Sequence, residues 1–156
     1  MSATYIRHLR RIGRELLAAK GALNYAGRSW DRHDLANDSD LREVGPQDIR
    51  NAADNLEATF IIRLFATFEG ILKEHLAQQH PGIAVPEDAR AVWLIDRAAV
   101  LQSPPIGAPL RQRVHDVRKY RNVLVHASSV LLPRMTFFEV LLRLITYLSK
   151  LPEPYS

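Results

Sequence analysis

The chain has 156 residues, of which 47% are hydrophobic, with no cysteine and a formal net charge of +4 at pH 7. These values predict one globular domain over residues 1–156, exclude disulfides and thiolate metal sites, and favour a polyanionic partner. The absence of an apolar N-terminal segment, together with charges that interrupt the longest apolar stretches, predicts a cytoplasmic protein without a membrane span.

Hydrophobic periodicity predicts an all-α fold, an antiparallel bundle of about five helices, with no alternating strand pattern anywhere. The first helix is expected over residues 5–23, with apolar side chains on one side. The opposite side carries four arginines, Arg7, Arg10, Arg11 and Arg14. This basic side either follows phosphates or is a solvated helix back.

Residues 27–45 are rich in Gly, Asp and Ser and are predicted to form a long loop. Arg28, Trp30 and Arg32 are its candidate RNA-binding residues, because an aromatic ring flanked by arginines can stack on a base. The alternative is that Trp30 anchors the loop to the helices.

Three further helices are bounded by prolines and glycines, at residues 46–79, near residues 92–101 and at residues 136–151. The first of these is apolar nearly all round at residues 60–72, which predicts a central helix with neighbours on several sides. Glu69 interrupts that stretch and is a candidate partner for an arginine of another helix. The last helix has more apolar surface than one contact needs, which predicts a dimer interface.

The remaining helix, residues 110–127, carries a polar face among apolar residues. Arg118, Asn122 and His126 share one face at i, i+4 and i+8. Arg111 and His115 extend that face toward the N-terminus. Arg121 lies instead on the apolar side of the helix, where a charge requires a carboxylate, a phosphate or a partner surface.

The segment Arg121-Asn122-Val123-Leu124-Val125-His126 resembles the signature of the HEPN superfamily, in which an Arg and a polar residue precede an apolar spacer and a His late in a small helical domain. The resemblance implies a helical bundle that dimerises through the motif helix. In many members it also implies a metal-independent endoribonuclease of toxin–antitoxin or defence systems. A second match, Arg28 to His33, is interpreted as coincidence because its spacer is charged and its surroundings lack helical periodicity.

The sequence therefore predicts a toxin or defence-type RNase that cuts RNA to 2′,3′-cyclic phosphate and 5′-hydroxyl ends. Arg121, Asn122 and His126 are the expected catalytic residues, Glu69, Arg118 and His115 the supporting ones, and Arg111 an RNA contact. No cofactor is expected, and no metal either, since the histidines lack ligand-type spacing. The alternative is a non-catalytic RNA- or nucleotide-binding module, partnered with a nucleotidyltransferase antitoxin as the resemblance allows.

Overall fold

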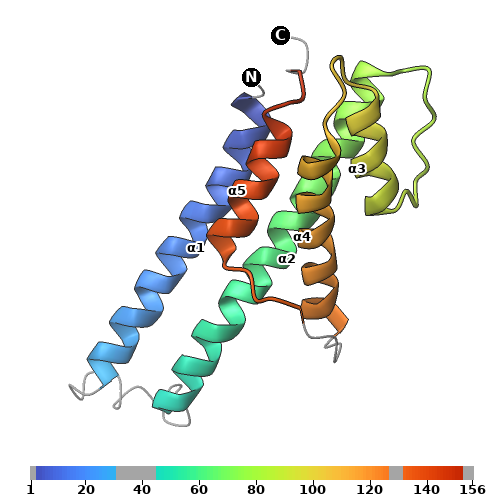
Figure 1. Ribbon diagram of the computed structural model, residues 1–156. Helices are drawn as coiled ribbons and strands as arrows, with labels where there is room; N and C mark the ends of the chain where they lie inside the picture. The colour runs from blue at the N-terminus through green and yellow to red at the C-terminus, as the bar shows by residue number, and fades with distance from the viewer. Residues whose placement is uncertain (1–2, 31–44, 127–131, 153–156) are drawn as a thin grey trace.

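All elements in the described part of the chain are α-helices (Figure 1). The computed structural model describes residues 3–30, 45–126 and 132–152. The five helices are α1 (Ala3–Trp30), α2 (Pro46–Gln79), α3 (Ala91–Val100), α4 (Ala108–His126) and α5 (Phe137–Leu148). The prediction of an all-α bundle of five helices is confirmed.

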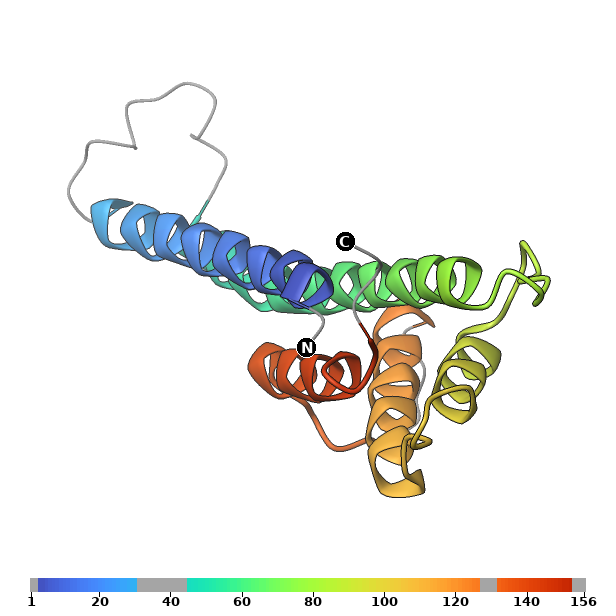
Figure 2. The ribbon, with the colours of Figure 1, turned by 90° about the horizontal axis from the view of Figure 1, so that it is seen from above.

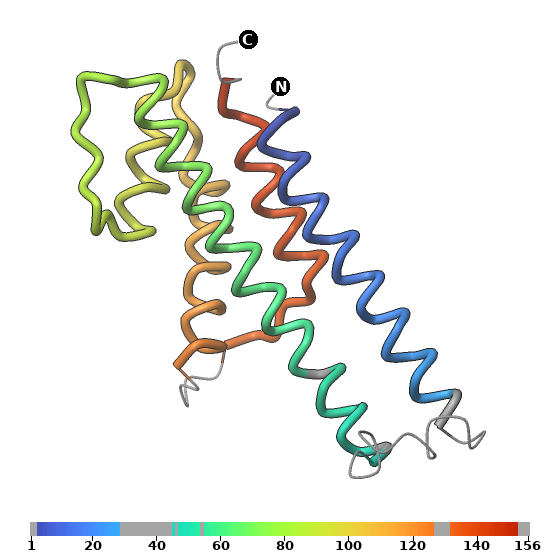
Figure 3. The backbone as a smooth tube through the Cα atoms, turned by 180° about the vertical axis from the view of Figure 1, so that it is seen from behind, coloured from blue at the N-terminus to red at the C-terminus, as the bar shows by residue number. Residues whose placement is uncertain are grey.

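Helix α2 is the centre of the bundle, because it contacts each of the other four helices. The long helices α1 and α2 run antiparallel, α5 lies along the N-terminal half of α1, and α4 crosses the C-terminal half of α2 (Figures 1 and 3). Viewed from above, α1 and α3 are at opposite ends of the molecule (Figure 2). The segment that is apolar all round supplies the core of α2, where Leu64, Phe68 and Leu72 are fully buried.

Helix α1 extends beyond its predicted end at residue 23 and continues to Trp30. The prediction of a loop beginning at residue 27 was therefore wrong. Glycine lowers helix propensity by only about 1 kcal/mol relative to Ala. A Cβ at Gly27 would lie 3.8 Å from Ile49 of α2, so the packing of the two long helices continues there and stabilises the additional turns.

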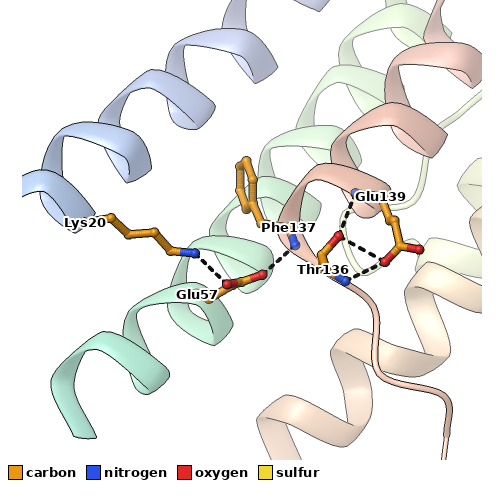
Figure 4. A network of polar contacts seen from close by, with 5 residues as sticks. All are labelled: Lys20, Glu57, Thr136, Phe137 and Glu139. Carbon is orange, nitrogen blue, oxygen red and sulfur yellow. Dashed lines mark hydrogen bonds and ion pairs between the residues drawn. The ribbon is translucent and has the colours of Figure 1, made fainter. Parts of the chain in front are cut away.

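A network of polar contacts joins α1, α2 and the start of α5 (Figure 4). Glu57 accepts hydrogen bonds from Lys20 Nζ at 2.6 Å and from the Phe137 backbone N–H at 2.8 Å. Thr136 caps α5, since its hydroxyl accepts from the Glu139 N–H while Glu139 accepts from the Thr136 N–H. Three chain segments distant in sequence are thereby held in one arrangement.

Candidate anion site on the motif helix

Arg121 is partly buried on the side of α4 that faces the core, in line with Val114 and Val117, which are fully buried. Its Nη1 donates a hydrogen bond of 3.2 Å to Oδ1 of Asn122. Its Nε is buried and has no hydrogen-bond partner. The neighbouring amide thus orients the guanidinium without neutralising it, and one donor remains to be satisfied.

Glu69 of α2 is an acidic residue that the positive charge of this guanidinium influences. Burial raises the pKa of the Glu69 carboxyl, and the positive charges of Arg121 and Lys73 oppose that shift only in part. Within the described residues no ion pair joins Glu69 to Arg121, so the expected salt bridge is not formed. Glu69 therefore lies in the field of Arg121, while Asn122 makes the direct contact.

Arg118, one turn before Asn122, adds a second cation to the same part of α4. It is partly buried, and its Nε also lacks a hydrogen-bond partner. No carboxylate in the described residues pairs with Arg118 or Arg121. Two partly buried guanidiniums without a paired carboxylate form an anion-binding environment, because Arg is suited to forked contacts with phosphate oxygens.

Arg111 and His115 occupy the N-terminal part of the predicted polar face, and both reach Asp96 of α3. His115 Nε2 lies 3.0 Å and Arg111 Nη1 3.6 Å from Oδ1 of Asp96. Sequence reasoning did not single out Asp96. The sequence feature that could have identified Asp96 is an acidic residue within a short apolar helix, between Ile95 and Ala98, both of which are buried. The contact shows that helix α3 covers this part of the face, which leaves Arg111 and His115 less available to a ligand.

His126 is the last residue of α4 and its side chain is exposed. Arg121 and His126 are five residues apart, which places them about 140° apart around an ideal helix. Among the described residues, no hydrogen bond or ion pair connects His126 to Arg121 or Asn122. One protomer therefore presents the arginine and the histidine of the motif in different directions.

Of the three RNA-binding residues predicted for the first loop, the structure places two in helix α1. Arg28 is an exposed residue in the last turn of α1, and Trp30 is the final residue of that helix. Arg32 lies outside the described residues, as does residue range 31–44. Arg28 is therefore presented by a helix rather than by a loop.

His75, near the C-terminal end of α2, is fully buried. Its Nε2 lies 3.2 Å from Nε2 of Gln102, whose amide also donates to the Ala98 carbonyl, and its Nδ1 is buried without a hydrogen-bond partner. Burial, and to a lesser extent the nearby His80, lowers the pKa of His75 to about 4. Its position follows from the apolar surface that α3 covers on α2, a tertiary contact with no signature in the local sequence.

Searches against protein-family models, curated proteins and solved structures found no match to this chain. No helix in the described residues combines the length and the apolar character needed to cross a membrane. The same residues contain no cluster of three or more His, Asp or Glu side chains arranged to bind a metal ion.

Proposed function

We propose that the protein is a metal-independent endoribonuclease of the toxin or defence type, in which the 2′-hydroxyl of RNA attacks the adjacent phosphorus. The bond from phosphorus to the 5′-oxygen then breaks, leaving a 2′,3′-cyclic phosphate and a 5′-hydroxyl. A base removes the 2′ proton, and an acid protonates the departing 5′-oxygen. His126 performs these proton transfers, because imidazole changes charge near neutral pH.

The observation that carries the proposal is the unneutralised guanidinium of Arg121. It is oriented by Asn122, retains a buried Nε without a partner, and has Arg118 as a second cation nearby. A preorganised donor of this kind stabilises the charge that collects on phosphoryl oxygens in the transition state, and one such donor is worth about 3 kcal/mol. Asn122 thus acts as a positioning residue for Arg121.

A homodimer would bring the two halves of the motif together. Arg121 and His126 point apart in one chain, so the proposed site combines Arg121 of one protomer with His126 of its partner. Exposed apolar side chains support association, with Val125 of α4 43% exposed and Phe138 and Leu142 of α5 50% and 66% exposed. Light scattering coupled to size-exclusion chromatography at micromolar concentration tests this, and a fully active monomer would refute the composite site.

The decisive experiment is cleavage of RNA by Arg121→Ala and His126→Ala in the presence of excess chelator. Each variant should lose activity by ~100-fold or more, which is the usual effect of removing one transition-state donor or proton carrier. Arg113→Ala is the matched control, since Arg113 is an exposed arginine of the same helix. Full activity in either motif variant, or loss of wild-type cleavage on chelation, would refute the mechanism.

The second candidate is a non-catalytic RNA- or nucleotide-binding module, associated with a nucleotidyltransferase antitoxin. It is favoured by the separation of exposed His126 from Arg121, which leaves the anion site without an adjacent acid or base. Induced expression in a bacterial host discriminates the two. Growth arrest by the wild type but not by His126→Ala indicates the nuclease, whereas equal growth of both indicates the binding module.

A further inference from the structure

Positive charge is concentrated in two helices of this chain, of which the motif helix α4 is only one. Helix α1 contains six cationic residues and a single acidic one, Glu15, a formal charge of +5. Helix α4 contains five cationic residues against Asp116, a formal charge of +4. Since the whole chain has a charge of +4, all remaining residues together sum to −5. The positive charge of α1 is therefore local, because the residues outside α1 and α4 are negative in sum.

The arginines of α1 gather on the side that faces away from the bundle. Arg7, Arg10 and Arg14 are exposed, and at i, i+3 and i+7 they lie within one sector of the helix. The opposite side packs into the core, with Leu9 and Leu16 fully buried. The outer face is thus free of the neighbouring helices and rigid, because the inner face is anchored.

Most other cations of α1 are already partnered, whereas these three are not. Lys20 is paired with Glu57 at 2.6 Å, and Arg11 with Glu15 at 3.0 Å. No ion pair within the described residues involves Arg7, Arg10 or Arg14. Three exposed guanidiniums without carboxylates attract a polyanion, and they make forked contacts with phosphate better than lysines would.

The same face continues toward the C-terminal end of α1 with an aromatic side chain. Tyr25 follows Arg7 by five helical turns, so the two share one direction, and its ring is 74% exposed. Exposed Ala18 and Gly21 lie between them and allow close approach of a backbone. Cations followed by an exposed aromatic ring are the pattern that binds single-stranded nucleic acid, through phosphate contacts and base stacking.

We infer that Arg7, Arg10, Arg14 and Tyr25 form an outer-face track that holds single-stranded RNA away from the motif helix. The choice of RNA rests on the function proposed above. Helix α1 contacts only α2 and α5 in the described structure, so the track is separate from α4 and extends the length of RNA that the protein holds. A lipid surface fits less well, because Leu17, which is 53% exposed, is the one large aliphatic side chain beside the arginines, and the apolar face of α1 that a membrane would take up is buried in the core.

The test measures binding of a labelled, unstructured RNA of about 20 nucleotides to full-length protein carrying His126→Ala, which prevents cleavage. Combining Arg7→Gln, Arg10→Gln and Arg14→Gln should weaken binding by about tenfold or more at low salt. It should also reduce the slope of log K against log salt by about 2, since each neutralised phosphate of a single strand contributes about 0.7. Thermal melting verifies that the variant remains folded.

The control removes the same charge elsewhere, through Arg50→Gln, Arg90→Gln and Arg97→Gln, three exposed arginines outside α1 and α4. A loss confined to the α1 variant supports the track. Equal losses in both variants, or an unchanged slope in the α1 variant, would overturn it, as would α1-dependent binding to anionic vesicles without binding to RNA. Because binding is measured without turnover, a protein that binds RNA through α1 yet never cleaves it refutes the nuclease and leaves the track standing.

Discussion

Glu57 and Glu69 are two carboxylates of the same helix, α2, in opposite electrostatic situations. Burial alone would raise the pKa of Glu57, but the hydrogen bonds from Lys20 and the Phe137 N–H hold it below the usual range. The pKa of Glu69 is raised, because burial outweighs the attraction of Arg121. Glu57 has both oxygens satisfied by groups from α1 and α5, whereas Glu69 has no such bonds among the described contacts.

The difference separates a carboxylate whose hydrogen bonds are satisfied from one that has no such partners. Each oxygen of Glu57 accepts a hydrogen bond from a different helix or helix start, so this network holds α1, α2 and α5 together. The Glu69 carboxylate and the Arg121 guanidinium, by contrast, form no ion pair, and the buried Nε of Arg121 has no hydrogen-bond acceptor. Unsatisfied polar groups cost stability, so their retention on α4 is consistent with a ligand that completes them.

His75, a third titratable group of α2, provides the largest expected effect. Between pH 6.5 and about 4 the unfolded chain binds a proton at this imidazole while the folded protein does not, so stability falls as the pH falls. The shift corresponds to about 3 kcal/mol at pH 4. His75→Gln keeps an acceptor for Gln102 and should remove this part of the acid sensitivity in urea unfolding.

The exposed His8 gives a matched control, since His8→Gln makes the same substitution at the surface without disturbing the core. An unchanged acid profile in His75→Gln would show that the imidazole is not held neutral, contrary to its buried position.

Glu57→Ala tests the structural side of the comparison. It leaves Lys20 and the Phe137 N–H without their acceptor. A hydrogen bond to a charged group contributes about 2 kcal/mol, and the pair with the partly exposed Lys20 adds little to this, so a total loss of about 2 kcal/mol is expected in urea unfolding at pH 7. Glu57→Gln should lose about half as much, because the amide oxygen still accepts from Phe137. A urea midpoint unchanged in both variants would show that the network in Figure 4 contributes nothing to stability.

Of these substitutions, Glu69→Gln should change stability least, and it should stabilise the protein rather than destabilise it. Since the folded-state pKa of Glu69 is raised, its ionisation disfavours folding at neutral pH, and removing the charge should raise stability slightly. The advantage should vanish below pH 4, where the carboxyl is protonated in both states. Destabilisation as large as that of Glu57→Gln would mean that Glu69 is a paired structural carboxylate after all.

The positions of most helices and of the motif could be read from the amino-acid sequence. Periodicity and prolines placed α2, α3 and α4 within two residues of their observed ends, because local backbone preferences act over a few residues. The anomalous position of Arg121 on an apolar side was also readable, since helical geometry alone assigns it. The end of α1 could not be predicted from the sequence, because the packing of Gly27 against Ile49 depends on a helix that follows later in the chain.

Which polar residues meet depends on how the helices pack. The pairing of Asp96 with Arg111 and His115, the burial of His75, and the absence of an ion pair between Glu69 and Arg121 all depend on how α2, α3 and α4 pack. Such contacts are decided by side chains that converge from distant segments, and a polar residue looks the same in sequence whether it is satisfied or left free. That distinction separates Glu57 from Glu69, and it exists only in the folded bundle.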